Sequence, residues 1–275
     1  MKSLLVGSVF KNTEPDQIEW LKLQLQFLES TTEDFDHVSF INCEEPEPFS
    51  GLTKVIGTGD GTIQTGRQHT AGLNGLANHF RTVKDEYENF LIIDSDAFPI
   101  KLDWLNILRT SMDKNNKSIA IALRPENLET RLHSSIVFMK SEVIPELKFN
   151  HGYEDSSVIG RDLLHMEELD VGIADFQEEK RDQVFPLIRT NKINVHPISC
   201  GVYFDMFYHH AFGSPTSSTQ FRIDIRGYNH YSDNDFPDLH ERIRSDPFTF
   251  VRRLAGWCPQ QYPGKPDQCK GETGA

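Results

Sequence analysis

Two aspartates separated by a single residue, Asp94 and Asp96, are the residues whose types and spacing point most directly to chemistry. They follow the apolar run Phe90-Leu91-Ile92-Ile93, which is typical of a strand buried on both faces. Side chains alternate along an extended chain, so both carboxylates point to the same side. Neighbouring carboxylates repel each other and lose hydration on burial, and a divalent cation removes both penalties. The stretch predicts Mn²⁺ or Mg²⁺ joining the protein to a phosphorylated substrate. The alternative is a polar turn, with Asp94 capping the next helix.

Two adjacent histidines, His209 and His210, could complete this metal site from far along the chain. Imidazole is a good ligand for metals of the Mn²⁺ class and a poor one for Mg²⁺. We expect only one of the two to bind, and we favour His210 slightly because it lies closer to the Gly-Ser turn at 213–214. The alternative is that one histidine is packed and the other is solvated.

A second group of polar residues begins the helix expected over 64–80. Arg67 and His69 lie at its start, where the helix dipole would help them to meet an anion. The alternative is a surface arginine and a capping histidine. Gly72 and Gly75 interrupt the helix, and each costs about 1 kcal/mol relative to Ala. Either a neighbouring strand or a ligand must therefore approach the backbone closely there.

Two further acids, Glu154 and Asp155, precede a helical segment expected over 158–169. Asp155 is a good residue to cap that helix, and this would be a purely structural role. The functional interpretation is a carboxylate held at the mouth of a sheet as a general base.

The elements that must position these residues alternate between strand and helix. Strands are expected at 4–9, 37–43, 55–56, 90–93, 118–123, 134–139, 194–199 and 201–207. Helices are expected at 13–28, 64–80, 101–112, 158–169 and 239–254. This alternation predicts an α/β fold with a mixed, mostly parallel sheet flanked by helices, and ligands outside the carboxyl ends of its strands.

Composition narrows the possible partners. The net charge of -13 over 275 residues disfavours nucleic acid, because phosphate backbones require concentrated Lys and Arg. The apolar start at 1–6 is too short for a signal peptide or a membrane span. Cys258 and Cys269 are the only near pair of cysteines, and a disulfide between them is weakly supported. We therefore expect a cytoplasmic protein.

Together these motifs resemble the nucleotide-sugar glycosyltransferases of the GT-A fold, in particular bacterial and phage-borne members. The Asp-x-Asp motif of that family is matched by Asp94-Ser95-Asp96, and its glycine-containing loop and helix by 66–74. Its acidic motif at a helix start is matched by Tyr153-Glu154-Asp155, and its late metal-binding histidine by His209 or His210. The four features occur in the family's order over roughly 1–215.

The resemblance implies a nucleoside diphosphate sugar as donor, most often UDP-linked, with Mn²⁺ or Mg²⁺ bridging the aspartates to the diphosphate. It implies a donor-binding set formed by Ser8, Phe10, Asn12, Asn42, Arg67, His69, Asn74, Asp94, Ser95 and Arg124. Asp155, with Glu154 beside it, would take the proton of the acceptor hydroxyl in an inverting enzyme, or orient the acceptor in a retaining one. The acceptor would be a carbohydrate, a protein or a small molecule.

The same reasoning predicts the organisation of the chain. A GT-A catalytic domain would span 1–215, with a nucleotide-sugar half at about 1–123 and an acceptor half at about 124–215. A helical or irregular extension would follow at 216–257, and a flexible tail at 258–275.

Two rival functions remain open. A haloacid-dehalogenase-type phosphatase also places an Asp-x-Asp motif after an apolar strand and uses Mg²⁺. In that class the motif usually opens the fold and a Thr or Val follows, whereas here Ala97 and Phe98 follow it deep in the chain. The other rival is a sugar-nucleotide-binding protein without turnover.

Overall fold

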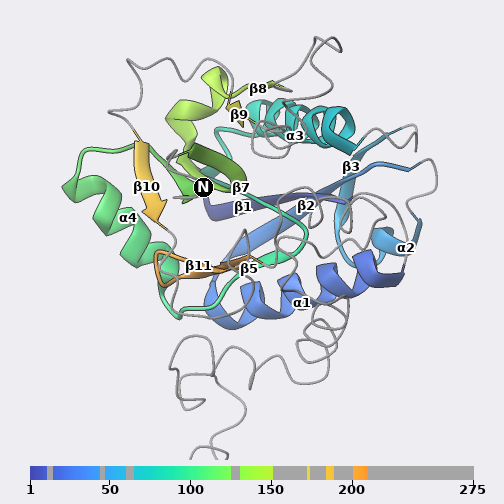
Figure 1. Ribbon diagram of the computed structural model, residues 1–275, viewed down its shortest axis with the longest axis horizontal. Helices are drawn as coiled ribbons and strands as arrows, with labels where there is room; N and C mark the ends of the chain where they lie inside the picture. The colour runs from blue at the N-terminus through green and yellow to red at the C-terminus, as the bar shows by residue number, and fades with distance from the viewer. Residues whose placement is uncertain are drawn as a thin grey trace, which may run out of the picture.

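Within the described residues, a seven-stranded sheet with helices on both faces forms the framework of the protein, as the computed structural model shows (Figure 1). The structure describes residues 1–10, 15–43, 47–59, 65–124, 131–150, 172–173, 184–188 and 201–209. The strands are β1 (Lys2–Phe10), β2 (Phe35–Ile41), β3 (Lys54–Thr58), β4 (Tyr87–Ile93), β5 (Ala97–Pro99), β6 (Ile119–Arg124), β7 (Arg131–Lys140), β8 (Phe149–Asn150), β9 (Gly172–Ile173), β10 (Val184–Ile188), β11 (Gly201–Tyr203) and β12 (Phe207–His209). The helices are α1 (Pro15–Thr31), α2 (Glu47–Ser50), α3 (Thr65–Thr82), α4 (Trp104–Lys114) and the 3-10 helix η1 (Ser141–Glu146).

The order of strands in the main sheet is β10-β6-β7-β4-β1-β2-β3. Strand β1 pairs in parallel with β2 and β4, β2 pairs in parallel with β3, and β6 pairs in parallel with β10. Strand β7 runs antiparallel to both β4 and β6. The predicted α/β class, with a mixed, mostly parallel sheet between helices, is therefore confirmed.

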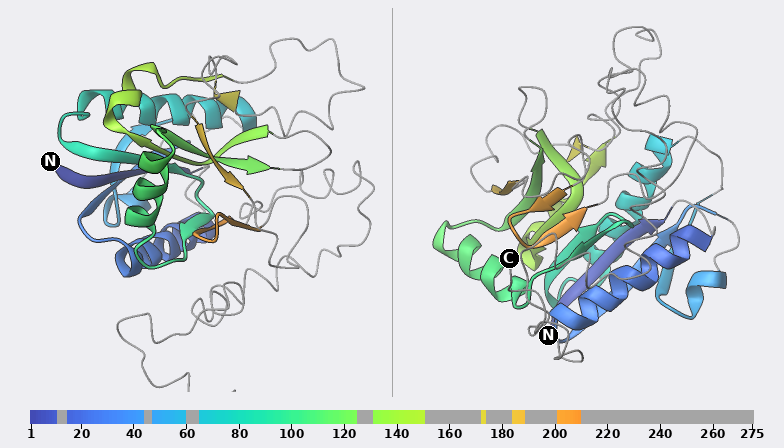
Figure 2. Two further views of the ribbon diagram at one scale, coloured as in Figure 1. Left: turned by 90° about the vertical axis from the view of Figure 1, so that its left-hand side faces the viewer. Right: turned by 60° about the horizontal axis from the view of Figure 1, so that its bottom comes forward.

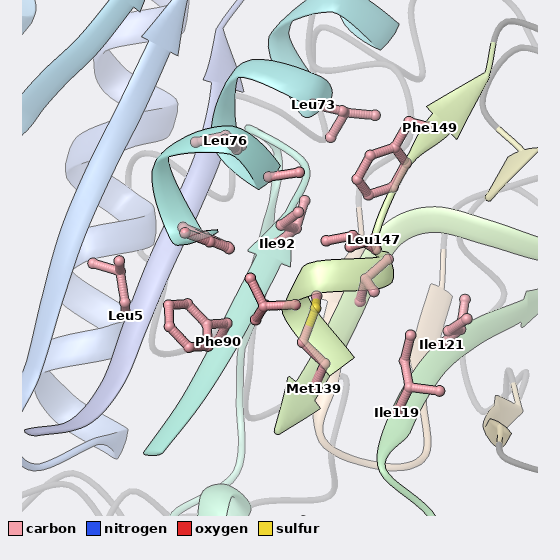
Figure 3. Packing of buried hydrophobic residues seen from close by; sticks show 14 of the residues in the cluster. Leu5, Leu73, Leu76, Phe90, Ile92, Ile119, Ile121, Met139, Leu147 and Phe149 are labelled. Atoms are coloured by element: carbon pink, nitrogen blue, oxygen red, sulfur yellow. The ribbon is translucent and has the colours of Figure 1, made fainter. Parts of the chain in front are cut away.

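The central strands β1 and β4 are buried on both faces, as their continuous apolar runs predict. Phe90 and Ile92 of β4 pack beneath Leu73 and Leu76 of α3 on one face (Figure 3). Leu91 and Ile93 alternate with them and pack on the opposite face, which is covered by α1 and α4. Figure 1 shows the resulting layers, with α3 above the sheet and α1 below it.

The glycines of α3 allow that helix to lie close to the sheet. A Cβ atom on Gly72 would be 2.6 Å from Val9, and one on Gly75 would be 2.6 Å from the ring of Phe40. Both distances are shorter than a carbon–carbon contact allows. The close approach expected from the sequence is therefore made by neighbouring strands rather than by a ligand.

The sheet also contains a change of direction in its connections. From β1 the chain continues to β2 and β3 on one side, and then returns to β4 on the other side of β1. In open α/β sheets, such a switch point marks the edge where ligands bind, outside the carboxyl ends of the strands. Asp94 follows the last residue of β4 and so lies at this edge.

One expected strand is wrong in the structure. The stretch 201–207 is not a single strand but a hairpin, in which β11 and β12 pair antiparallel. Its turn is made by Phe204 and Asp205, whose φ angles are 52° and 53°, and the Met206 N–H donates to the Tyr203 carbonyl at 3.0 Å. Positive φ at both central positions is the geometry of a type I′ turn, which favours Asn and Gly. Neither residue is present, so the sequence carries no turn signal.

Other expectations are either adjusted or untested. The helix expected over 101–112 is α4, which begins at Trp104. The strand expected at 194–199, the helices at 158–169 and 239–254, Cys258 and Cys269, and the tail lie outside the described residues, and the domain boundaries stay predictions. Among the residues that the structure does describe, no helix is both long and apolar enough to cross a bilayer.

Candidate metal centre

Asp94, Asp96 and His209 come together as the sequence predicts. One potential ligand atom from each residue lies within 4.8 Å of those of the other two. The Nε2 atom of His209 is 3.2 Å from Oδ2 of Asp94 and 3.4 Å from Oδ1 of Asp96. Two carboxylates and an imidazole converge on one point, which is the donor set expected for a divalent cation of the Mn²⁺ class.

The two aspartates are held by a tight turn between β4 and β5. The turn is closed by a hydrogen bond of 3.0 Å from the Ala97 N–H to the Asp94 carbonyl. The Asp94 N–H donates in turn to the carbonyl of Ser135 on β7, at 2.9 Å. The backbone on both sides of the motif is therefore fixed to the sheet.

The histidine is delivered by the β11–β12 hairpin. Strand β12 pairs antiparallel with β5, and this register places His209 opposite Ala97, the residue after Asp96. Tyr203, Met206 and Phe207 of the hairpin pack with Leu28 of α1 and Trp104 of α4. The hairpin (orange in Figure 2) therefore lies on the α1 side of the sheet, and its packing fixes the imidazole at the aspartates.

The site concentrates negative charge in a largely dry environment. The side chain of His209 is 2% exposed and that of Asp96 is 10% exposed, whereas Asp94 is partly buried. Burial alone lowers the pKa of the His209 imidazole, but the carboxylates of Asp96 and Asp94 outweigh burial and raise the pKa above its ordinary value. The carboxylates thus attract positive charge to the position of Nε2, so the residues present fit a bound cation.

His69 approaches the same site from the first turns of α3. Its Nε2 atom is 3.6 Å from Oδ1 of Asp94, and its side chain remains 29% exposed. The two oxygens of Asp94 therefore face different imidazoles, His209 at Oδ2 and His69 at Oδ1. This contact shows that the amino-terminal end of α3 borders the cluster.

No protein-family model and no curated protein sequence matches this chain. A crystal structure of a glycosyltransferase involved in the glycosylation of the major capsid of PBCV-1 is similar over 52% of this chain and 63% of that one, with 12% identity and a TM-score of 0.35. The mannosyltransferase PcManGT from Pyrobaculum calidifontis, in complex with GDP-Man and Mn²⁺, is similar over 53% of this chain and 46% of that one, with 12% identity and a TM-score of 0.37. The chain thus matches less than two thirds of either protein. Similarity this partial does not establish a family.

His209 is the candidate histidine that the described part of the chain places at the carboxylates. His210, which the sequence slightly favoured, lies outside the described residues, and its role stays a prediction. The position of His209 at the aspartates follows from the register between β12 and β5.

Several residues of the expected donor-binding set have partners within the protein. Ser8 and Phe10 are fully buried, and Asn42 is 5% exposed. The side-chain amide of Asn74 donates to the Phe149 carbonyl at 2.7 Å and accepts from the Phe149 N–H at 2.9 Å. Asn74 thus joins α3 to β8, which gives it a structural role.

The remaining members of the set can be placed only in part. Ser95 lies in the turn between the two aspartates and is partly buried. Arg67 lies in the first turn of α3 and Arg124 ends β6, but their side chains are not among those described. Asn12, Glu154 and Asp155 lie outside the described residues. Their contacts with a nucleotide or an acceptor stay predictions.

The sequence analysis missed Gln24, a fully buried residue of α1. Its side chain donates to the carbonyls of Asp94 and Ala97, at 2.9 and 2.7 Å. The signal was available: Gln24 lies three residues after Leu21 and four before Leu28, on the apolar face of the helix. A polar residue on a buried face needs hydrogen-bond partners, and these are the two ends of the metal-binding turn.

Proposed function

We propose that this protein is a metal-dependent glycosyltransferase of the GT-A fold, which moves a sugar from a nucleoside diphosphate sugar to an acceptor hydroxyl. The observation that carries the proposal is the convergence of Asp94, Asp96 and His209 at the switch point of a mostly parallel sheet. This edge of an α/β sheet is where nucleotides bind, and metal-bound diphosphates are held there through carboxylates.

The donor set favours Mn²⁺ over Mg²⁺, because one of the three ligands is an imidazole. Asp94, Asp96 and His209 would supply three ligands to the cation and would leave its other coordination positions to diphosphate oxygens. Bound there, it would offset the negative charge that develops on the leaving diphosphate.

The electrostatics of the cluster make nucleotide binding depend on metal. Two largely buried carboxylates repel a diphosphate, so the anion can approach only when a cation lies between them. On the far side of Asp94, the amino-terminal end of α3 offers the positive end of a helix dipole, and His69 offers a ring N–H. We propose that Arg67, in the same turn, contacts the diphosphate.

The acceptor side of the reaction follows from the resemblance. Asp155 is proposed to take the proton of the acceptor hydroxyl if configuration is inverted, or to orient the acceptor if it is retained, with Glu154 beside it. The sugar nucleotide is proposed to be UDP-linked and the protein to act in the cytoplasm. A carbohydrate, a protein or a small molecule would be the acceptor.

The test is calorimetric titration of UDP and GDP into the protein with Mn²⁺ or with EDTA. We expect binding of one nucleotide only with Mn²⁺, and its loss in Asp96→Ala with the fold retained. Asp113→Ala is the matched control, because Asp113 pairs with Lys140 at the opposite end of β4, at 2.7 Å. Unchanged nucleotide binding in Asp96→Ala would refute the proposal.

Turnover separates the proposed enzyme from its rivals. Metal-dependent hydrolysis of UDP-glucose or UDP-galactose without acceptor is expected of the transferase and not of a binding protein. Release of phosphate from a simple phosphomonoester, lost in Asp94→Asn, would instead identify the phosphatase. Asp155→Asn should retain donor binding and slow transfer, and a normal transfer rate would remove Asp155 from the catalytic residues.

A further inference from the structure

The side chain of Gln24 contacts both ends of the turn that carries the metal-binding aspartates. Its Nε2 atom donates to the Asp94 carbonyl at 2.9 Å and to the Ala97 carbonyl at 2.7 Å. A backbone hydrogen bond from the Ala97 N–H to the Asp94 carbonyl closes that turn. The amide of Gln24 therefore adds two hydrogen bonds from α1 to a short and strongly charged segment.

The orientation of this amide is fixed by its surroundings. A flipped amide would place its oxygen against two carbonyl oxygens, so the nitrogen must face the turn. Its oxygen then accepts from the Ser8 hydroxyl at 2.7 Å and from Nε2–H of His37 at 3.0 Å. Two donors and two acceptor positions are all used, so Gln24 is fully satisfied and cannot rotate without losing hydrogen bonds.

The turn fixed by Gln24 connects the two halves of the candidate metal centre. Asp94 and Asp96 lie within it, and Ala97 is the first residue of β5, the strand against which β12 places His209. A displacement of the Ala97 carbonyl would shift both the Asp96 carboxylate and the register partner of His209. One side chain from α1 thus bonds to the backbone on both sides of Asp96, next to the register partner of His209.

We propose that Gln24 is a positioning residue of the metal centre, holding the aspartates together before the cation binds. This inference rests on the proposed metal-dependent function. Without Gln24, mutual repulsion of the carboxylates would open the turn, and part of the metal-binding free energy would be spent on closing it. Hydrogen bonds around metal ligands typically contribute a factor of about 10 to 100 in affinity.

A purely structural role makes a different prediction, and Thr53 provides the control. Its hydroxyl is 2.8 Å from Nδ1 of His37 and 3.1 Å from the His37 carbonyl, at the end of the same buried polar network that is remote from the turn. Thr53→Val removes hydrogen bonds from that network without touching Asp94 or Ala97. A general loosening of the core would affect this variant and Gln24→Met alike.

The experiment measures the binding of Mn²⁺ alone, by the EPR signal of free Mn²⁺, to wild type, Gln24→Met and Thr53→Val. Unfolding by urea in EDTA is measured in parallel. We expect Gln24→Met to bind Mn²⁺ roughly 10- to 100-fold more weakly, whereas Thr53→Val keeps wild-type affinity while losing stability. If Gln24→Met does not fold, Gln24→Glu is used, because it keeps shape and polarity but turns an acceptor oxygen toward the carbonyls.

The outcomes separate this inference from the proposed function. Wild-type Mn²⁺ affinity in a folded Gln24 variant would overturn the positioning role and leave the transferase proposal intact. Equal weakening in Gln24→Met and Thr53→Val would also overturn it, in favour of general loosening. Failure of the wild type to bind Mn²⁺ would overturn both proposals.

Discussion

The buried imidazole of His37 should make the protein lose stability in mild acid. Among the residues that the structure describes, His37 makes its side-chain hydrogen bonds with neutral groups: Gln24 of α1, Ser8 of β1 and Thr53 before β3. Burial without a compensating charge lowers its pKa to about 3. The unfolded chain keeps a histidine pKa of about 6.5, so between these values the unfolded state binds the proton that the folded state rejects.

The sign and size of the effect follow from this difference. The stability associated with neutral His37 is fully present above pH 6.5 and is lost as the pH falls toward about 3. At pH 5, about 1.5 units below the unfolded-state pKa, the loss is about 2 kcal/mol. Domains are usually stable by roughly 5 to 15 kcal/mol, so this loss is a substantial part of the free energy of unfolding.

The assay is urea unfolding at pH 7.5 and pH 5 in EDTA, for wild type and His37→Gln. The variant will be less stable at both pH values, but its stability should fall by about 2 kcal/mol less between them, because the titrating group is gone. His79→Gln is the control, since His79 is only partly buried on α3 and lies near both Lys54 and Glu86. Equal pH dependence in wild type and His37→Gln would refute the reasoning.

Two further predictions test the packing of the sheet and the assembly of the site. Gly75→Ala should destabilise the protein by about 1 to 3 kcal/mol, because its Cβ would lie 2.6 Å from a Phe40 ring that already packs against other glycines. Gly51→Ala, where no atom lies within 4 Å, should change stability by less than about 0.5 kcal/mol; equal effects in urea unfolding would contradict the packing argument. Saturating Mn²⁺ should slow amide hydrogen exchange in β12, which pairs with β5, and leave the exchange rates in α4 unchanged. Exchange rates in β12 that are the same with and without Mn²⁺ would contradict the proposed site.

The sequence was most informative where local chemistry decides structure. A short, continuous apolar run that ends in a polar turn is typical of a strand inside a sheet, so the strand before Asp94 and its exit into the turn were predictable. The helix over 64–80 was predictable from its apolar face and proved to be α3, at 65–82. Both elements carry residues of the site, and so the carboxylates and His69 were identified.

Positions that depend on long-range pairing could not be found in the same way. The pairing of β12 with β5 brings His209 to the aspartates, and that pairing joins segments more than a hundred residues apart. The hairpin that creates this pairing turns at Phe204 and Asp205, neither of which signals a type I′ turn. The register of a strand pair depends on both segments, so the periodicity within one segment does not predict it.

Because the position of His209 depends on long-range pairing, the site needs support from the core. Asp94 and Asp96 belong to one short turn, whereas His209 arrives on a hairpin whose only strand partner in the described sheets is β5. Three strand residues on each side provide little pairing energy, so packing of the hairpin against Trp104 and α1 must hold the histidine in place. The hydrogen bonds from Gln24 to the Asp94 and Ala97 carbonyls oppose the mutual repulsion of the two carboxylates. Buried polar groups therefore hold the turn with Asp94 and Asp96, and apolar packing holds the hairpin with His209. A cation that binds all three donors benefits because both parts of its site are already in position.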